Sequence, residues 1–433
     1  MYQPELEAMA RPELEALQLE RLNGLLARVY ENVPMYRTKL DEAGAAPRVS
    51  SLDELAGLPF TVKDDLRAAY PYGMFAVPLR DIVRVHSSSG TTGQVSVVGY
   101  TANDISNWAD LMARTIASAG GTADDVVQIA YGYGLFTGGL GAHYGAERLG
   151  ATAIPISGGN TRRQVQVLKD FGTTILACTP SYALLIGETA AEMGIDLGEL
   201  PLRAGIFGAE PWSESMRTQI EEILGVQAID IYGLSEVMGP GVASECSEQH
   251  GLHVNEDHFI IEILDPETLR PVPDGQQGEV VFTTITKEGI PLLRYRTRDI
   301  SRIITGECAC GRTFRRMERI TGRTDDMLII RGVNVYPSQI EQVLVSIPGV
   351  APHYQVVLSK RGSMDHVEVH VEVGPEVSFD EVKTLERLRN RVAAEIASSL
   401  AVNLNVKLVE PKSIQRSEGK AKRVVDLRNE GSE

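Results

Sequence analysis

Cysteine is scarce in this chain, with four residues among 433, at positions 178, 246, 308 and 310. This number is too small for a secreted fold of this size that depends on disulfides. Long apolar runs are missing as well: no stretch of about 18 apolar residues occurs, and Met1–Glu7 lack the basic and apolar parts of a leader peptide. We therefore expect a cytoplasmic protein without a membrane partner.

Basic residues are in the minority, with 42 Lys and Arg against 58 Asp and Glu, for a net charge of −16. Such a balance disfavours nucleic acid as the main partner, although a local basic site can still bind phosphates. The length of 433 residues and the 43% hydrophobic content allow two or three domains with a substantial core. We expect a folded protein whose ligands are small molecules.

The first half of the chain has the pattern of α/β layers. Leucines at helical spacing predict amphipathic helices over residues 5–44. Short β-rich runs then alternate with helical segments, which favours strands whose carboxyl ends present loops to a ligand-binding crevice. The expected strands are 82–85, 126–130, 152–156, 174–177 and 204–207, and the expected helices between them include 161–171 and 180–193.

The second half changes character twice. Residues 258–304 predict a small antiparallel sheet with strands at 259–264, 278–284 and 300–304. After Gly322 the pattern restarts as an α+β unit, with strands at 327–330, 354–358 and 367–373 and helices at 337–346 and 379–399. We predict an N-terminal domain over residues 1–322, a hinge over 323–326 and a C-terminal domain over 327–433.

Hydroxyl and glycine residues alternate between Ser87 and Gln94. Glycines let a backbone approach an anion closely, while hydroxyls and successive N–H groups donate to phosphate oxygens. The spacing is not that of a Walker loop, and a cluster of this composition is by itself more often a surface loop. The candidate phosphate-binding residues are Ser88, Ser89, Gly90, Thr91, Thr92 and Gly93.

Four further signals follow this loop in a fixed order: Tyr232–Glu236, Tyr295–Asp299, Gly322–Asp326 and Ser417–Lys420. Together the five signals resemble the adenylate-forming enzymes, the superfamily of acyl-CoA synthetases. Finer strings are similar to its phenylacetate–CoA ligase branch, namely Leu58–Lys63, Tyr131–Gly139, Phe207–Trp212 and Arg331–Pro337. The resemblance covers nearly the whole chain. It implies an α/β adenylation domain with a small antiparallel β subdomain, followed by a small mobile α+β domain.

The resemblance implies a nucleotide site. Glu236 matches the glutamate that binds Mg²⁺ beside ATP, and Mg²⁺ suits one carboxylate together with phosphate oxygens. Asp299 matches the aspartate that accepts hydrogen bonds from the ribose hydroxyls, for which a carboxylate has enough lone pairs, and Tyr232 matches the aromatic stacked on adenine. Arg323 matches the arginine that follows, although an Asp–Arg pair on a surface would contribute little. Further residues of this site are Gly208, Ala209, Glu210, Pro211, Asp230 and Gly233.

Two lysines are candidate catalytic residues. Lys63 lies in a segment that this branch uses near the phosphates, with an ordinary surface lysine as the alternative. Lys420 matches the lysine that stabilises charge developing during adenylation, with a basic tail that includes Lys412 and Lys422 as the alternative. Adenylation and thioester formation at one site require the C-terminal domain to present a different face in each step. The resemblance assigns the hinge of this rotation to Asp325.

The carboxylic acid is expected against flat apolar side chains and small residues, a combination that fits an aryl group. The candidates are Tyr131, Tyr133, Phe136, Gly138 and Ala209, and the alternative is that these aromatics are core residues. A separate group, Cys246, Cys308, Cys310 and either His253 or His250, has the ligand types of a closed structural zinc site. We prefer His253, and reduced cysteines without a metal are the alternative.

We predict an ATP-dependent ligase that converts an aryl acid to an acyl adenylate and then to its CoA thioester, with phenylacetate as the leading acid. Gln94 and Asn255 depart from the Lys and Trp usual in the branch, which leaves open a substituted benzoate or an anthranilate, with CoA, a carrier protein or an amine as acceptor. A non-catalytic relative that binds nucleotide and acid is a third reading. The resemblance also suggests a homodimer.

Overall fold

A computed structural model gives the structure of this chain. It describes residues 1–87, 96–325, 327–330, 333–361, 364–374, 377, 381–400, 402–417 and 421–428. The candidate phosphate-binding residues Ser88–Gly93 and the candidate lysine Lys420 lie outside the described residues. None of the helices in the described part is both long and apolar enough to cross a membrane.

The N-terminal segment is helical, as its periodicity predicts. Helices α1 (Pro4–Glu7), α2 (Arg11–Asn32) and α3 (Pro34–Glu42) each have a proline in the first turn, where no backbone donor is lost. Leu22, Leu26 and Val29 lie on one face of α2 and are fully buried against the main core. The chain continues through η1 (Leu52–Gly57), α4 (Lys63–Ala68) and η2 (Leu79–Asp81).

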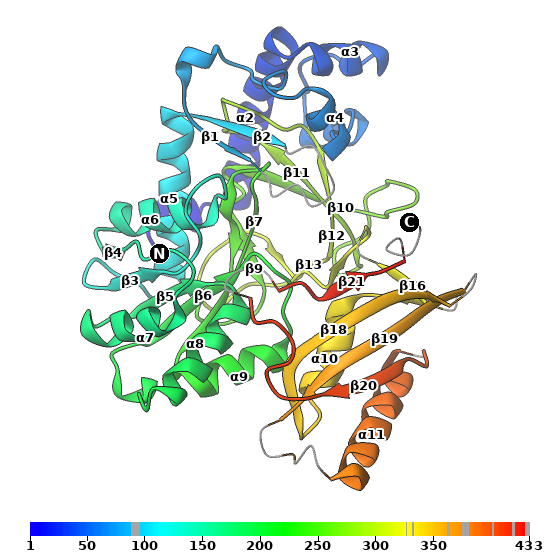
Figure 1. The fold of residues 1–433 in the computed structure, drawn as a ribbon. Helices are drawn as coiled ribbons and strands as arrows, with labels where there is room; N and C mark the ends of the chain where they lie inside the picture. The colour runs from blue at the N-terminus through cyan, green and yellow to red at the C-terminus, as the bar shows by residue number, and fades with distance from the viewer. Residues whose placement is uncertain are drawn as a thin grey trace.

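A nine-stranded sheet of described residues forms the centre of the molecule (Figure 1). Its parallel strands are β3 (Val126–Ile129), β4 (Thr152–Ile154), β5 (Ile175–Cys178), β6 (Ala204–Gly208) and β7 (Gln227–Leu234). Antiparallel strands extend the sheet beyond β7: β8 (Gly239–Ser244), β9 (Leu252–Val254), β13 (Ile303–Ile304) and β14 (Arg316–Met317).

Helices cover both faces of this sheet. On one face, α5 (Ala102–Ser118) and α6 (Gly138–Leu149) share a core with Ile129 and Ala177. On the other, α7 (Thr161–Asp170), α8 (Pro180–Glu192) and α9 (Glu214–Leu224) pack against Leu176 and Phe207. Because neighbouring residues of a strand point to opposite faces, Leu176 and Ala177 enter different cores. The α/β layers are therefore confirmed.

The predicted strand at 82–85 does not join this sheet. β1 (Ile82–Ser87) instead pairs antiparallel with β2 (Val97–Thr101) as a separate two-stranded sheet. Val83 and Val85 are exposed in β1, so only one face of the strand is covered. A strand buried on both faces of a parallel sheet has no such exposed valines.

A four-stranded antiparallel sheet follows in the order β10 (Phe259–Leu264), β11 (Gly278–Thr284), β12 (Tyr295–Ser301) and β15 (Gly322–Arg323). The predicted third strand at 300–304 is wrong in its bounds: β12 begins at Tyr295, and Ile303–Ile304 belong to the central sheet. The charges of 296–299 are accommodated because Arg296 pairs at 2.7 Å with the fully buried Glu279 of β11. Charged side chains paired across neighbouring strands are compatible with a sheet.

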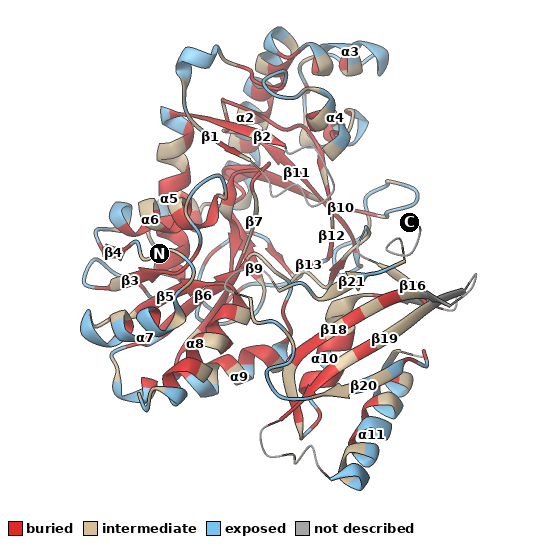
Figure 2. Cartoon of the chain, in the orientation of Figure 1, coloured by how far each residue is buried: buried red, intermediate tan, exposed pale blue. Residues whose placement is uncertain are grey.

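The C-terminal unit has a core of its own, separate from both N-terminal cores. Its sheet has the order β20 (Asn405–Val409), β19 (Met364–Val373), β18 (Val350–Arg361) and β21 (Val424–Asp426). The helices α10 (Pro337–Val345) and α11 (Val382–Leu400) pack against it, and β16 (Leu328–Ile330) pairs with β17 (Val333–Val335) near its start. Figure 2 shows its buried residues along the strands and exposed ones on α11. The short strands β17, β20 and β21 are additions to the predicted elements.

Candidate active site

A cavity of about 820 Å³ lies at the carboxyl ends of the central strands. This is the edge at which α/β sheets bind ligands. The segments after β6 and β7 meet there with α4, with β12 and with the residues around β15. The predicted site residues that line the cavity are Lys63, Tyr131, Phe136, Gly138, Ala209, Gly233, Glu236, Arg323 and Asp325.

Glu236 provides a buried carboxylate to this cavity. It lies just beyond the end of β7, and its side chain is 5% exposed. The Lys63 ammonium is 3.6 Å from its Oε1, so the candidate metal ligand and a candidate catalytic lysine are close in space although 173 positions separate them in the sequence, from 63 to 236.

Lys287 contacts the backbone at Glu236 and was not among the predicted site residues. Its Nζ donates to the backbone oxygens of Glu236 and Val237 at 3.2 and 3.0 Å, and it lies 4.6 Å from the centroid of the Tyr100 ring. Burial lowers the pKa of Lys287 to about 7, although the charges of Asp104 and Glu236 oppose this. A single lysine before Glu288 has no sequence signal that separates it from a surface residue.

Asp299, Tyr232 and Arg323 form one hydrogen-bonded group. The Tyr232 hydroxyl donates to Asp299 Oδ2 at 2.6 Å, and Arg323 donates to Asp299 Oδ1 at 2.8 Å. Strand pairing sets this arrangement, because Asp299 of β12 lies opposite Arg323 of β15. Arg323 also makes a bidentate contact with Asp325, at 2.9 and 3.0 Å. Arg323 lines the cavity, whereas Asp299 and Tyr232 are not among its lining residues.

The acid-binding candidates divide into two groups. Tyr131, Phe136, Gly138 and Ala209 line the cavity, and a Cβ on Gly138 would come within 2.5 Å of the Phe136 ring. Tyr131 is 6% exposed, and its hydroxyl is buried away from the cavity surface. Tyr133 instead packs edge to face on His143, with the ring centroids 6.0 Å apart.

Several nucleotide-site candidates have their side chains engaged elsewhere. Asp230 is 3.2 Å from Arg319, and burial, with the nearby charge of Glu245, raises its pKa. The Glu210 carboxylate accepts from backbone N–H groups outside the cavity. Pro211 is exposed, and a Cβ on Gly208 would lie 2.1 Å from the backbone oxygen of Ile231.

The cysteine cluster is assembled at the edge of the central sheet. Cys246 follows β8, His253 lies in β9, and Cys308 and Cys310 lie between β13 and β14. Their four ligand atoms lie within 4.8 Å of one another. Burial opposes ionisation of Cys310, but hydrogen bonds from His253 and Arg312 lower its pKa to about 5, whereas burial raises that of Cys246 to about 12. His250 Nδ1 faces Arg316 instead, at 2.9 Å.

Asn255 lies in a buried polar network. Its amide donates to the backbone oxygen of Gly241 at 2.9 Å, and its Oδ1 accepts from Arg114 at 3.2 Å. Arg114 makes a bidentate pair with Asp257, and the two side chains are 2% and 1% exposed. Asn255, which replaces the tryptophan usual in this branch, therefore contributes to the packing between α5 and the segment before β10.

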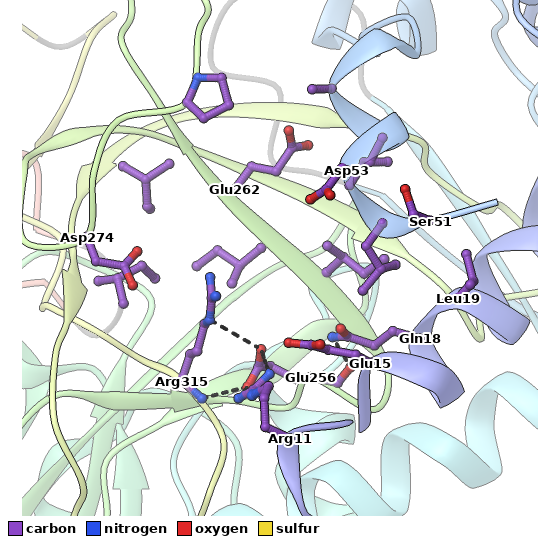
Figure 3. Close-up of a pocket in the computed structure, with 18 of the residues that line it drawn as sticks. Arg11, Glu15, Gln18, Leu19, Ser51, Asp53, Glu256, Glu262, Asp274 and Arg315 are labelled. Carbon is purple, nitrogen blue, oxygen red and sulfur yellow. Dashed lines mark hydrogen bonds and ion pairs between the residues drawn. The ribbon is translucent and has the colours of Figure 1, made fainter. Parts of the chain in front are cut away.

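A second cavity of about 630 Å³ lies between α2, η1 and β10 (Figure 3). Arg11 and Arg315 flank the Glu256 carboxylate, at 2.7 and 4.0 Å, and Glu262 is paired with Arg294 at 2.8 Å. Glu256 and Glu262 are thus each paired with arginine. None of the predicted site residues lines this cavity in the described part of the chain.

Comparison with known proteins agrees with the motifs. The family of AMP-binding enzymes matches residues 31–286, and the AMP-binding enzyme C-terminal domain matches residues 332–428. The phenylacetate–coenzyme A ligase of Thermus thermophilus is 52% identical over 99% of this chain and 100% of its own length. That of Escherichia coli is 52% identical over 98% of this chain and 97% of its own length. The chain belongs to the phenylacetate–CoA ligase family.

Solved structures of a 2-hydroxyisobutyryl-CoA ligase in two states are similar to this member of the phenylacetate–CoA ligase family to different degrees. Its post-adenylation state with R3-HIB-AMP gives a TM-score of 0.92 at 31% identity, covering 98% of this chain and 91% of that one. Its thioesterification state with 2-HIB-AMP and CoA gives 0.73 at 33% identity, covering 98% and 92%. The sequence match is nearly the same, so the difference lies in the arrangement of the chain.

Polar contacts hold the C-terminal unit of this family member against α8. Glu188 accepts from His353 Nε2 at 2.7 Å and is 3.5 Å from Arg416 Nε. One turn further along the helix, Glu192 pairs with Lys412. The N-terminal unit therefore contributes acidic groups to this contact, and the C-terminal unit contributes basic ones.

Proposed function

We propose that the chain activates an aryl carboxylic acid with ATP and transfers it to coenzyme A, with phenylacetate as the preferred acid. The acid carboxylate attacks the α-phosphorus, pyrophosphate leaves, and the CoA thiol then displaces AMP from the acyl adenylate. The observation that carries this proposal is the meeting of Glu236, Arg323 and the aryl-pocket side chains at one cavity. Sequence identity of 50 to 52% to four phenylacetate–CoA ligases supports the choice of acid.

We assign the nucleotide to Glu236 in the cavity and to Asp299 and Tyr232, which are linked to the lining residue Arg323 through the Arg323–Asp299 hydrogen bond. Glu236 would hold Mg²⁺, which neutralises phosphate charge when it is bound. Asp299 would accept the ribose hydroxyls, and the Tyr232 ring beside it would face the adenine. Lys63 is 3.6 Å from Glu236 and is exposed enough to reach a phosphate, so we assign it to the phosphate end with Ser88–Gly93.

The acid half of the cavity is assigned to Tyr131, Phe136, Gly138 and Ala209. Flat ring faces and a glycine leave space for an aryl group between them. Because Asn255 belongs to the Arg114 network, its departure from the family pattern does not argue against phenylacetate. A substituted benzoate or an anthranilate is the second candidate acid and stays in the test.

We further propose that residues 327–433 move as a domain about Asp325, bringing Lys420 to the α-phosphate in the first step. Arg323 holds Asp325 through two hydrogen bonds, and these must change when the backbone there rotates. The higher TM-score to the post-adenylation state supports an adenylation-type arrangement for the structure described here. Residues 1–322 would form the stationary domain.

Zinc is the metal that suits the cysteine cluster. A tetrahedral site with Zn–S bonds of about 2.3 Å has S···S edges of about 3.7 Å, and Cys246 Sγ and Cys308 Sγ are 3.7 Å apart. The low pKa of Cys310 favours the thiolate that a metal requires. Zinc held by Cys246, His253, Cys308 and Cys310 would fasten the ends of β8, β9 and β14 together. Its role would be structural, since all four positions are filled by protein.

ATP–pyrophosphate exchange across a panel of aryl and alkyl acids tests the function, with each reaction repeated in the presence of CoA. We expect exchange with phenylacetate and formation of phenylacetyl-CoA. Exchange with a benzoate or an anthranilate alone would replace phenylacetate as the substrate. Transfer only to a carrier protein or an amine would replace CoA as the acceptor. Absence of exchange with every acid would favour a non-catalytic role. The scarcity of cysteine and of long apolar runs supports a cytoplasmic location. The family resemblance supports a homodimer, which the solution mass would check.

A further inference from the structure

The carboxylate of Glu210 connects the two units next to the candidate active site. Oε1 accepts from the backbone N–H of Ser181 at 2.8 Å, and Oε2 accepts from the backbone N–H of Ala421 at 2.8 Å. Ser181 is in the first turn of α8, whereas Ala421 follows Lys420 directly in the sequence. One side chain therefore links the rim of the N-terminal unit to the segment that carries the candidate lysine.

Contacts within the N-terminal unit fix the position of this carboxylate. Glu210 follows β6 by two residues, and Ala209 between them has a left-handed φ of 72° and lines the cavity. Gly208 packs against Ile231 so closely that a Cβ would not fit. The Ser181 N–H belongs to the group of helix donors that have no partner within their own helix, and a carboxylate is the favoured acceptor there.

A carboxylate of the C-terminal unit likewise accepts a hydrogen bond from the N-terminal unit. Glu341 of α10 accepts from the backbone N–H of Ser213 at 3.2 Å and lies 3.3 Å from Arg423. Arg423 stacks over the Tyr354 ring at 4.6 Å, and its backbone oxygen accepts from Val356 at 2.7 Å. The residues just after Ala421 are thus fixed to the body of the C-terminal unit. Figure 1 shows this segment, in red before β21, running between the two units.

We propose that Glu210 is a positioning residue for the first half-reaction: through the Ala421 N–H it fixes the residue that follows Lys420 in the sequence against the N-terminal unit. This inference rests on the proposed ligase function and on movement of the C-terminal unit. Glu210 belongs to the stationary unit and Ala421 to the moving one, so the contact exists only while the adenylation arrangement lasts. Glu210 therefore favours formation of the acyl adenylate and has no part in the attack of CoA.

Glu210→Gln and Glu210→Ala test this role, with each half-reaction measured by itself. In both variants we expect the maximal rate of ATP–pyrophosphate exchange to fall roughly 10-fold to 100-fold, the range expected for loss of a charge-assisted hydrogen bond. The KM for ATP should change little. The rate at which preformed acyl adenylate and CoA give thioester should stay within about twofold of wild type, because this contact is already broken then.

Glu221→Gln is the matched control, because Glu221 accepts from the Ala228 N–H at 2.9 Å within the N-terminal unit only. It should leave both half-reactions unchanged. Equal loss of both half-reactions in Glu210→Gln would show a general structural role and overturn the proposal. So would a higher KM for ATP at unchanged maximal rate, which would make Glu210 a nucleotide contact. A wild-type protein without exchange would instead refute the proposed function.

Discussion

Lys287→Met should remove a dependence of stability on pH that the wild-type protein has above pH 7. Lys287 is fully buried, and burial lowers its pKa from 10.5 to about 7. In the unfolded chain its ordinary pKa returns. Between pH 7 and 10.5 the folded protein carries a neutral amine and the unfolded chain carries an ammonium, so unfolding takes up a proton and the free energy of unfolding rises with pH.

The pH range between the folded and unfolded pKa values of Lys287 sets the size of this change in the free energy of unfolding. One proton changes the free energy of unfolding by about 1.4 kcal/mol per pH unit, so the difference between wild type and Lys287→Met should grow by about 2 to 3 kcal/mol from pH 7.5 to 9.5. Below pH 7 lysine is protonated in both states and the difference stays constant. The loss of the hydrogen bonds to the Glu236 and Val237 oxygens adds an offset that does not vary with pH.

Urea unfolding at pH 7.5, 8.5 and 9.5, followed by tryptophan fluorescence, measures this difference. The tryptophans are Trp108 on α5 and Trp212 after β6, so the signal reports the unit that contains Lys287. Lys169→Met is the control, since Lys169 is exposed on α7. A wild-type minus Lys287→Met difference that is the same at all three pH values would refute the reasoning. It would mean that the two carbonyl contacts keep Lys287 protonated in the folded state.

Other predictions concern the cavity and the buried networks. Asp299→Asn should raise the KM for ATP in pyrophosphate exchange by roughly 10-fold to 100-fold, because a charged acceptor is lost; a change below about twofold would argue against ribose binding. Elemental analysis should find zinc in the wild type and in the control variant Cys178→Ala, but not in Cys310→Ser. Cys310→Ser should also unfold at a lower temperature. A wild-type protein without metal would contradict the zinc assignment. Arg114→Met should lower the free energy of unfolding by about 3 to 5 kcal/mol, since it removes the bidentate partner of the buried Asp257 charge. Arg114→Met combined with Asp257→Leu should recover part of that loss, and a fully additive result would show that the pair is not coupled.

Much of the fold follows from local pattern. The parallel strands β3, β4, β5 and β6 lie close to the predicted segments because buried parallel strands are short apolar runs that few other structures explain. β12 was misplaced because Arg296 and Arg298 favour a loop when read alone. Their partner Glu279 lies on a neighbouring strand, and only the folded sheet brings the charges together.

The candidate site depended on motifs rather than on periodicity. Glu236 and Arg323 come from different segments, and no spacing rule places them at one cavity, so the family resemblance was necessary. Lys287 and the Glu210 contact were beyond prediction for a related reason. Lys287 has an unremarkable local sequence, and the Glu210–Ala421 contact joins residues 211 positions apart through the docking of two units.

The contact between α8 and the C-terminal unit has a consequence for how this protein responds to its solvent. Glu188 and Glu192 face His353, Arg416 and Lys412, while each unit keeps its apolar core to itself. Such a boundary has little hydrophobic adhesion, so ionic strength screens it while leaving the interior of either unit intact. If the C-terminal unit moves as we propose, salt should shift the balance between its docked and released forms, and the balance of the two half-reactions should shift with it.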